Sequence, residues 1–107
     1  MIEIFRYHTE DGCEPVTDWL QSLRDKQAQA KIRVRIKRLE AGNFGDCEPV
    51  GDGVQELREH LGAGYRVYFA RHAQTLVILL CAGSKKSQAS DIKTAKVYWE
   101  DWKRRQV

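Results

Sequence analysis

An uninterrupted apolar run at residues 76–80 constrains the fold of this chain more than any other feature. A strand that is apolar at every position must be covered on both faces, so the run predicts an interior strand of a sheet. A second strand is expected over residues 65–71, because turn signals at residues 62–64 and 72–74 bracket that segment. The sequence therefore predicts a sheet that contains these two strands side by side.

Strand alternation assigns the side chains of residues 65–69 to two faces. Tyr65, Val67 and Phe69 share one face and suit a core, whereas Arg66 and Tyr68 share the other. A planar guanidinium suits phosphate, and a neighbouring aromatic ring suits a stacked base. The alternative is a strand whose outer face is simply solvated, because exposed arginine and tyrosine are ordinary.

Helical spacing of apolar residues predicts two helices in a hairpin and a third helix near the C-terminus. The first begins at Pro15, which suits the first turn of a helix, and the second spans about residues 26–41. The third begins near Ser87 or Ser90, and we expect its Trp99 and Trp102 to be core anchors.

Two further strands are expected at residues 2–8 and 54–61, and the glycine-rich segment 44–53 is expected to be a loop. The resulting order is β-α-α-β-β-β-α. It predicts an α+β fold, with the helical hairpin packed on one side of a twisted, mostly antiparallel sheet. A chain of 107 residues corresponds to one domain, covering residues 1–107.

Composition and motifs exclude several classes of protein. The N-terminal residues show no signal peptide, and the longest apolar run is too short to span a bilayer, so we expect a cytoplasmic protein without a membrane partner. Three cysteines without a C-x-x-C spacing and three scattered histidines match neither a disulfide framework nor a zinc motif. We therefore expect no metal and no other cofactor.

The charges are unevenly distributed although the net charge is only +3. Residues 24–38 contain seven bases and one acid, residues 40–60 contain six acids and one base, and residues 83–107 contain seven bases and three acids. Two basic zones on a small domain suggest a polyanionic partner. The alternative reading of each basic zone is a solvated helix face.

The order of elements resembles the RelE/ParE superfamily of bacterial toxins. The strings "VQELREHLGAGYRVYFAR" and "TLVILLCAGSKKSQASDIKTAKVYWEDW" resemble its HigB-like branch, whose members are often described as addiction-module killer proteins. The resemblance implies a toxin held inactive by an antitoxin encoded beside it. RelE-like and HigB-like members cut messenger RNA in the ribosomal A site, whereas ParE-like members poison DNA gyrase.

The resemblance also assigns site residues. Arg66 occupies the position of an active-site arginine, Arg58 matches an arginine on the preceding strand, and Lys85 and Lys86 lie where RelE-like toxins have another arginine. The chain departs from the pattern in two places. Gln55 and Glu56 replace lysines of RelE-type toxins, and Ser90 or Asp91 stands near the position of their stacking tyrosine.

Cleavage of RNA by its 2′-hydroxyl requires deprotonation of the nucleophile, stabilisation of the phosphorane and protonation of the 5′-oxygen. Arg66 and Arg58 can stabilise the charge without a metal, which predicts a metal-independent endoribonuclease. His60 is a candidate base, because it is the histidine expected on the face of the two arginines. Lys85 and Lys86 can act as acid or base, or as plain phosphate contacts.

The expected function is that of a type II toxin that cuts messenger RNA on the ribosome and inhibits translation. The alternative is a non-enzymatic, ParE-like poison of DNA gyrase, and a third reading is a decayed toxin that only binds its antitoxin. The expected partners are messenger RNA, the ribosome and a cognate, HigA-like antitoxin with a helix-turn-helix. Three bases on a shared flank of the second helix are expected to contact ribosomal RNA or the antitoxin: Lys31, Arg35 and Arg38.

Overall fold

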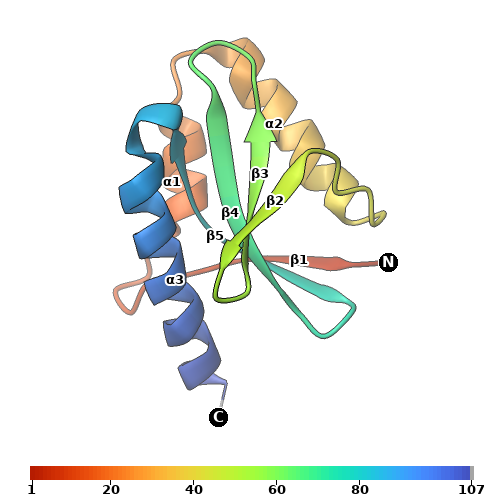
Figure 1. Cartoon of the computed structure of the whole chain (residues 1–107), viewed down its shortest axis with the longest axis vertical. Coiled ribbons are helices and arrows are strands. Elements are labelled where there is room, and N and C mark those ends of the chain that lie inside the picture. Colours follow the sequence, from red (N-terminus) through yellow and green to blue (C-terminus); the bar gives the residue numbers. More distant parts are fainter. Residues whose placement is uncertain (107) are drawn as a thin grey trace.

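A mixed five-stranded sheet forms the middle of the molecule (Figure 1). The computed structural model describes residues 1–106. The strands lie in the order β1-β5-β4-β3-β2, with β1 parallel to β5 and the other neighbours antiparallel. Their bounds are β1 (Glu3–Arg6), β2 (Cys47–Gly51), β3 (Val54–Glu59), β4 (Tyr65–His72) and β5 (Leu76–Ser84). The expected α+β fold is confirmed, and the apolar run lies in β5, an interior strand.

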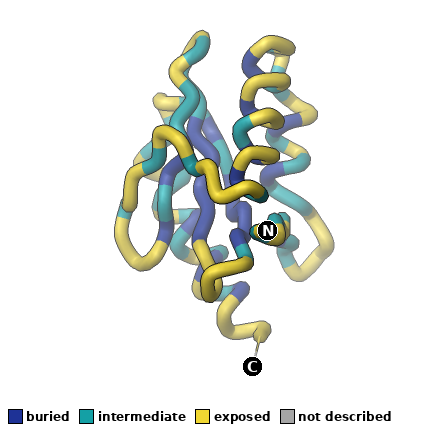
Figure 2. Tube along the Cα trace, turned by 90° about the vertical axis from the view of Figure 1, so that its right-hand side faces the viewer, coloured by how far each residue is buried: buried dark blue, intermediate teal, exposed yellow. Residues whose placement is uncertain are grey.

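Three helices cover the two faces of this sheet. The hairpin consists of α1 (Pro15–Ser22) and α2 (Lys26–Leu39), and the chain ends in α3 (Gln88–Arg105) after a 3₁₀ turn, η1 (Lys85–Ser87). Asp25 caps α2, since its carboxylate accepts a hydrogen bond from the backbone N–H of Ala28 at 3.1 Å. Figure 2 shows that burial is concentrated in the interior strands and alternates along the helices, as amphipathic elements require.

Each face of the sheet has its own hydrophobic core. The hairpin contributes residues such as Leu20, Ile32 and Ile36, which pack against Val67 and Phe69 of β4. On the opposite face, Trp99 and Trp102 of α3 pack with Tyr68. The two indole rings are stacked with their centroids 5.5 Å apart, so the prediction that they anchor the core is confirmed.

The prediction that residues 44–53 form only a loop was wrong, because they contain β2. This strand pairs with β3 through a two-residue turn in which Asp52 and Gly53 both have positive φ angles, 57° and 85°. An Asp-Gly pair is well suited to such a turn. The glycines and Pro49 obscured the strand in the sequence, but proline is tolerated on an edge strand such as β2.

Candidate active site

Four polar side chains project from β3 and β4 toward the face that α3 covers. Glu56 lies opposite Tyr68 in the strand register, and Arg58 lies opposite Arg66. Because α3 packs across this face, Arg66 and Tyr68 are buried rather than exposed. The expectation that the two residues share a face was correct, but the expectation that this face is open was wrong.

Glu56 forms the centre of this cluster, with only 2% of its side chain exposed. Its Oε2 accepts hydrogen bonds from the hydroxyl of Tyr68 at 3.1 Å and from Nε2 of Gln88 at 2.8 Å. The Nε of Arg66 lies 3.4 Å from the same oxygen, and the Nε of Arg58 lies 3.9 Å from Oε1. A carboxylate this deeply buried needs such partners, because an uncompensated buried charge is strongly destabilising.

Tyr68 belongs to the core and is not a platform for stacking on RNA. It has no exposed surface, and its hydroxyl is directed to Glu56. Burial raises the pKa of Tyr68 well above its usual value, and the neighbouring carboxylate raises the pKa further. The prediction that Tyr68 binds RNA therefore needs correction, because α3 covers the ring that would have to stack on a base.

Arg66 combines a fixed stem with free terminal nitrogens. Its side chain is 10% exposed, and its Nε makes no hydrogen bond although it lies beside Glu56. Within residues 1–106 its terminal nitrogens also donate no hydrogen bond, so they are available to a ligand. A Cβ placed on Gly64 would lie 3.9 Å from Nη1 of Arg66 and 3.7 Å from Cβ of Lys85. The turn at Gly64 thus has both cationic residues as neighbours.

The segment of Lys85 and Lys86 is held beside this turn by backbone contacts. The N–H of Lys85 donates to the carbonyl of Gly64 at 2.9 Å. Gly83, which pairs with Arg66, lies so close to α3 that a Cβ there would be 1.9 Å from Oδ2 of Asp91. These contacts bring Lys85 close to Arg66. Both lysines are exposed, so their ammonium groups lie in solvent.

Arg58 has a different environment, because three carboxylates surround its guanidinium. Its nitrogens lie 2.7 Å from Glu48, 3.6 Å from Asp46 and 3.9 Å from Glu56. The side chain is 24% exposed. Because its charge is already compensated, Arg58 contributes less positive potential to the surface than its position in the sequence suggests.

His60 lies just beyond the end of β3 and is linked to Arg58 through a shared carboxylate. Its Nε2 is 2.7 Å from Oδ2 of Asp46, and 74% of its side chain is exposed. The hydrogen bond with His60 is the main reason that the pKa of Asp46 is lowered, with a smaller contribution from the charge of Arg58. His60 is thus accessible, but its Nε2 faces an acid.

The three bases expected on α2 separate into two groups. Arg35 is largely buried, and its guanidinium donates to the backbone carbonyls of Arg58 and Asp46 and faces Glu59. It therefore joins α2 to the end of β3 and is not free for a partner. Lys31 and Arg38 are exposed, and they border a groove of about 520 Å³ that also has Val34 and Leu61 in its lining.

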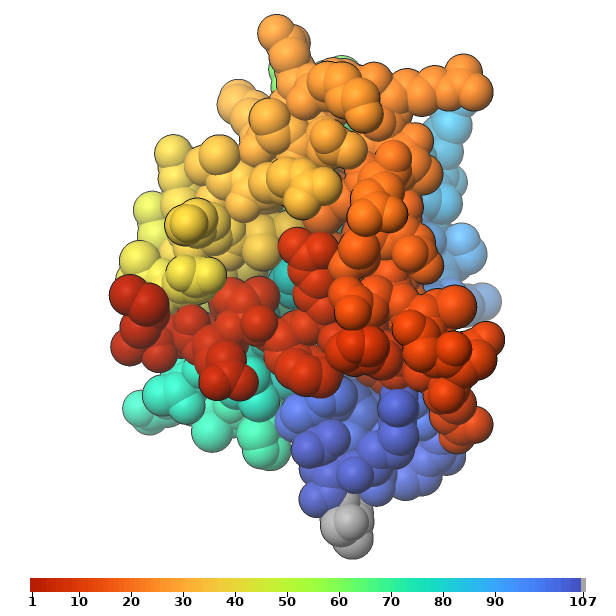
Figure 3. Space-filling model, turned by 180° about the vertical axis from the view of Figure 1, so that it is seen from behind, coloured from red at the N-terminus to blue at the C-terminus, as the bar shows by residue number. Residues whose placement is uncertain are grey.

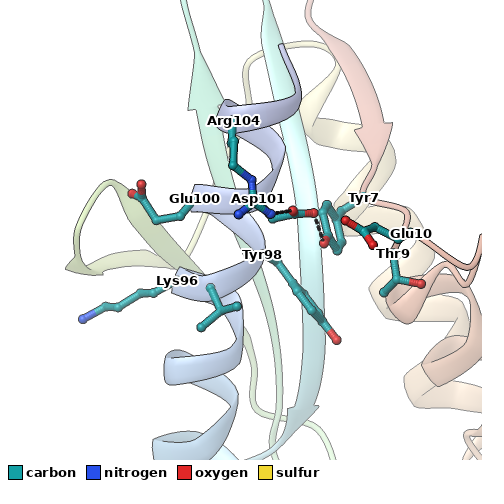
Figure 4. Close-up of a pocket in the computed structure, with 9 residues that line it drawn as sticks. Tyr7, Thr9, Glu10, Lys96, Tyr98, Glu100, Asp101 and Arg104 are labelled. Atoms are coloured by element: carbon teal, nitrogen blue, oxygen red, sulfur yellow. Dashed lines mark hydrogen bonds and ion pairs between the residues drawn. The ribbon is translucent and has the colours of Figure 1, made fainter. Parts of the chain in front are cut away.

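A larger hollow of about 710 Å³ lies elsewhere, between α3 and the segment that follows β1 (Figure 4). Tyr7 and Tyr98 are stacked there with ring centroids 4.5 Å apart, and the Tyr7 hydroxyl donates to Asp101 at 2.6 Å. None of the arginines of the β3–β4 cluster lines this hollow. Size alone therefore does not identify the chemical site, and the charged cluster around Arg66 remains the candidate.

Two comparisons place the chain among known proteins. The model of the phage-derived protein Gp49-like family (DUF891) matches residues 18–103. An uncharacterized protein of Haemophilus influenzae (strain ATCC 51907 / DSM 11121 / KW20 / Rd) is 54% identical over 79 residues, which cover 74% of this chain and 80% of that protein. The chain belongs to the Gp49-like family, which is part of the RelE/HigB-like toxin superfamily.

No helix within residues 1–106 has both the length and the apolar character needed to cross a membrane. In the same range, no three side chains of His, Cys, Asp or Glu are grouped as metal ligands would be.

Proposed function

We propose that this protein is the toxin of a type II toxin–antitoxin system and that it cuts messenger RNA on the ribosome. The observation that carries the proposal is the state of Arg66. Its guanidinium is held beside the buried carboxylate of Glu56, while its terminal nitrogens make no hydrogen bond within residues 1–106. A preorganised cation of this kind stabilises the charge that develops on a phosphorane. Membership in the Gp49-like family supports the same activity.

In the proposed reaction the 2′-hydroxyl of the message attacks the adjacent phosphorus, and the 5′-oxygen leaves. Arg66 stabilises the additional negative charge, and Lys85 and Lys86 bind the flanking phosphates. The 2′-hydroxyl loses a proton and the 5′-oxygen gains one. His60 is the candidate base, since its side chain is exposed and histidine is the residue most often used in general acid–base catalysis. The ribosome positions the message, which reduces the demand on the acid and base.

Poisoning of DNA gyrase is the second candidate function, and one observation favours it. Arg58 is compensated by three carboxylates, and Glu56 stands where RelE-type toxins have a lysine, so the site has less positive charge than theirs. A toxin that binds without cutting does not need that charge in a transition state.

Primer extension on cellular messages after induction of the toxin distinguishes the two functions. We expect cuts within translated reading frames, and about 100-fold or more weaker cutting after induction of Arg66→Lys. Intact messages together with induction of the DNA-damage response would instead support the gyrase function. We also propose that the toxin is silenced by an antitoxin encoded beside it, a helix-turn-helix protein of the HigA type.

A further inference from the structure

Glu56 is the most deeply buried charged side chain in the sheet, yet the proposed chemistry does not use it. We propose that Glu56 is a positioning residue, which holds the guanidinium of Arg66 in the orientation that receives a phosphate and links this orientation to the docking of α3. This inference rests on the proposed function for its consequence in catalysis. Its structural part, the control of Arg66 by Glu56, is independent of the target.

One oxygen atom of Glu56, Oε2, contacts three neighbouring side chains. Oε2 of Glu56 accepts from Tyr68 on β4 at 3.1 Å and from Gln88 in the first turn of α3 at 2.8 Å, and it lies 3.4 Å from Nε of Arg66. These two hydrogen bonds fix the carboxylate from two sides. The carboxylate in turn attracts the Nε edge of Arg66, so the opposite edge, with the terminal nitrogens, is left for a ligand.

Charge explains why a carboxylate suits this position. Arg58 and Arg66 are directly opposite each other on neighbouring strands, where like charges destabilise a sheet. Glu56 lies near the Nε of both guanidinium groups, at 3.9 Å and 3.4 Å, and compensates their repulsion. Arg58 also has Glu48 and Asp46 as partners, whereas Glu56 is the carboxylate beside the largely buried Arg66. A neutral residue at position 56 would therefore leave Arg66 facing another cation without compensation.

Gln88 connects this arrangement to the basic segment of the site. It is the first residue of α3 and follows η1, which contains Lys85 and Lys86. Its contact with Glu56 spans 32 positions of the chain. The lysines and Arg66 are thus fixed relative to each other through Glu56, and a displacement of about 1 Å in such a site can cost about 100-fold in rate.

The test combines a spectroscopic and a kinetic readout on the full-length protein. The Nε–Hε resonance of Arg66 is recorded by NMR for the native protein and for Glu56→Gln, which keeps the volume of the side chain and removes its charge. We expect this resonance to move toward those of exposed arginines in Glu56→Gln. The matched control is Glu48→Gln, which removes an exposed carboxylate beside Arg58 and should leave the Arg66 resonance unchanged.

The kinetic readout is cleavage of a translated message by Glu56→Gln, by Arg66→Lys and by the double variant. We expect Glu56→Gln to slow cleavage about 10- to 100-fold. The same change should cost less than about twofold when Arg66 is already lysine, because Glu56 acts through Arg66. Equal losses in both backgrounds, or an unmoved Arg66 resonance in folded Glu56→Gln, would overturn the inference.

Two outcomes separate this inference from the proposed function. If the native protein does not cut RNA but the Arg66 resonance responds to Glu56→Gln, the nuclease function fails and the positioning role stands. If Glu56→Gln does not fold, Gln88→Ala tests the same link from a partly exposed position. That variant should shift the Arg66 resonance in the same direction and slow cleavage about 3- to 10-fold, and an unshifted resonance would overturn the inference.

Discussion

Arg66 is the residue on which the proposed chemistry depends most, and its burial decides how it should be tested. Arg66→Ala would leave Glu56 without its nearest cation and would lower the free energy of unfolding by about 3–5 kcal/mol, the range for a broken buried pair. Arg66→Lys keeps a positive charge near Glu56 but loses the planar fork. We predict that Arg66→Lys folds and loses about 100-fold or more in cleavage rate.

Growth arrest and thermal unfolding measured on the same Arg66→Lys protein check this prediction. Arg33→Lys is the matched control, because it makes the same exchange of cations at an exposed position of α2 outside the candidate site, and it should leave growth arrest unchanged. A folded Arg66→Lys toxin that arrests growth as the native protein does would contradict the role assigned to Arg66.

Gly83 is the second position at which one residue decides the geometry of the site. An alanine Cβ there would lie 1.9 Å from Oδ2 of Asp91 and 2.7 Å from Oγ of Ser87, which are hydrogen-bonded to each other at 2.5 Å. We predict that Gly83→Ala lowers the free energy of unfolding by about 1–3 kcal/mol, as overpacking does. In an Asp91→Ala background the cost should fall to about half, which urea unfolding of the four proteins measures. If Gly83→Ala lowers the free energy of unfolding equally in both backgrounds, the added Cβ does not clash with Asp91.

The C-terminal half of α3 is joined to the segment that follows β1 by a clamp around Asp101. Its carboxylate accepts from Tyr7 at 2.6 Å and faces Arg104 and Arg105, and Arg105 also donates to the carbonyl of His8. Figure 3 shows the N-terminal segment lying across the molecule, above the end of the C-terminal helix. These contacts connect the two ends of the chain.

This clamp predicts a specific dependence of stability on pH. The hydrogen bond from Tyr7 is the main reason that the pKa of Asp101 falls to about 2. An unfolded aspartate has a pKa of about 3.9, so the clamp stabilises the fold above about pH 4 and this contribution is lost as the pH falls toward 2. The difference in unfolding free energy between native protein and Asp101→Asn should therefore shrink over that range.

Urea unfolding at several pH values measures this difference. Glu100→Gln is the control, because Glu100 is an exposed neighbour whose ion pair is with Lys103. A difference between native protein and Asp101→Asn that stays constant down to pH 2 would show that the charge of Asp101 does not stabilise the clamp.

The basic face of α2 predicts salt-dependent binding to the ribosome. Lys31 and Arg38 are exposed, whereas Arg35 binds the backbone at the end of β3. We predict that the double reversal Lys31→Glu with Arg38→Glu weakens ribosome binding and flattens its dependence on salt. The double reversal Arg33→Glu with Lys37→Glu changes the same charge on the other side of α2 and should have less effect. If both double reversals flatten the salt dependence of ribosome binding equally, the overall charge of α2 attracts the ribosome and Lys31 and Arg38 have no specific role.

At the scale of the whole molecule, most of the fold could be predicted from periodicity and turn signals. The apolar run in β5, the stripe of α3 and the proline at the start of α1 each identified an element. The strand β2 could not be predicted, because an edge strand with a proline and glycines has the composition of a loop.

The candidate site was less predictable than the fold. Alternation placed Arg66 and Tyr68 on one face, but only the assembled fold shows that α3 covers it. Glu56 appeared in the sequence only as a departure from a family pattern, and its partner Gln88 is 32 positions away. The apolar character of β5 on both faces and the tryptophans of the C-terminal helix were the signals that the sheet has no open side.

The central claim is that Arg66 promotes cleavage of translated RNA, and a reconstituted translation reaction tests it most directly. Purified toxin is added to ribosomes that translate a defined message, and the ends of the fragments are mapped. We predict cuts that require translation, with a 2′,3′-cyclic phosphate on the upstream fragment, and a loss of about 100-fold or more in the cutting rate of Arg66→Lys. If the message stays intact while the same toxin preparation inhibits DNA supercoiling by gyrase, the protein is not a ribosome-dependent nuclease and the role assigned to Arg66 is contradicted.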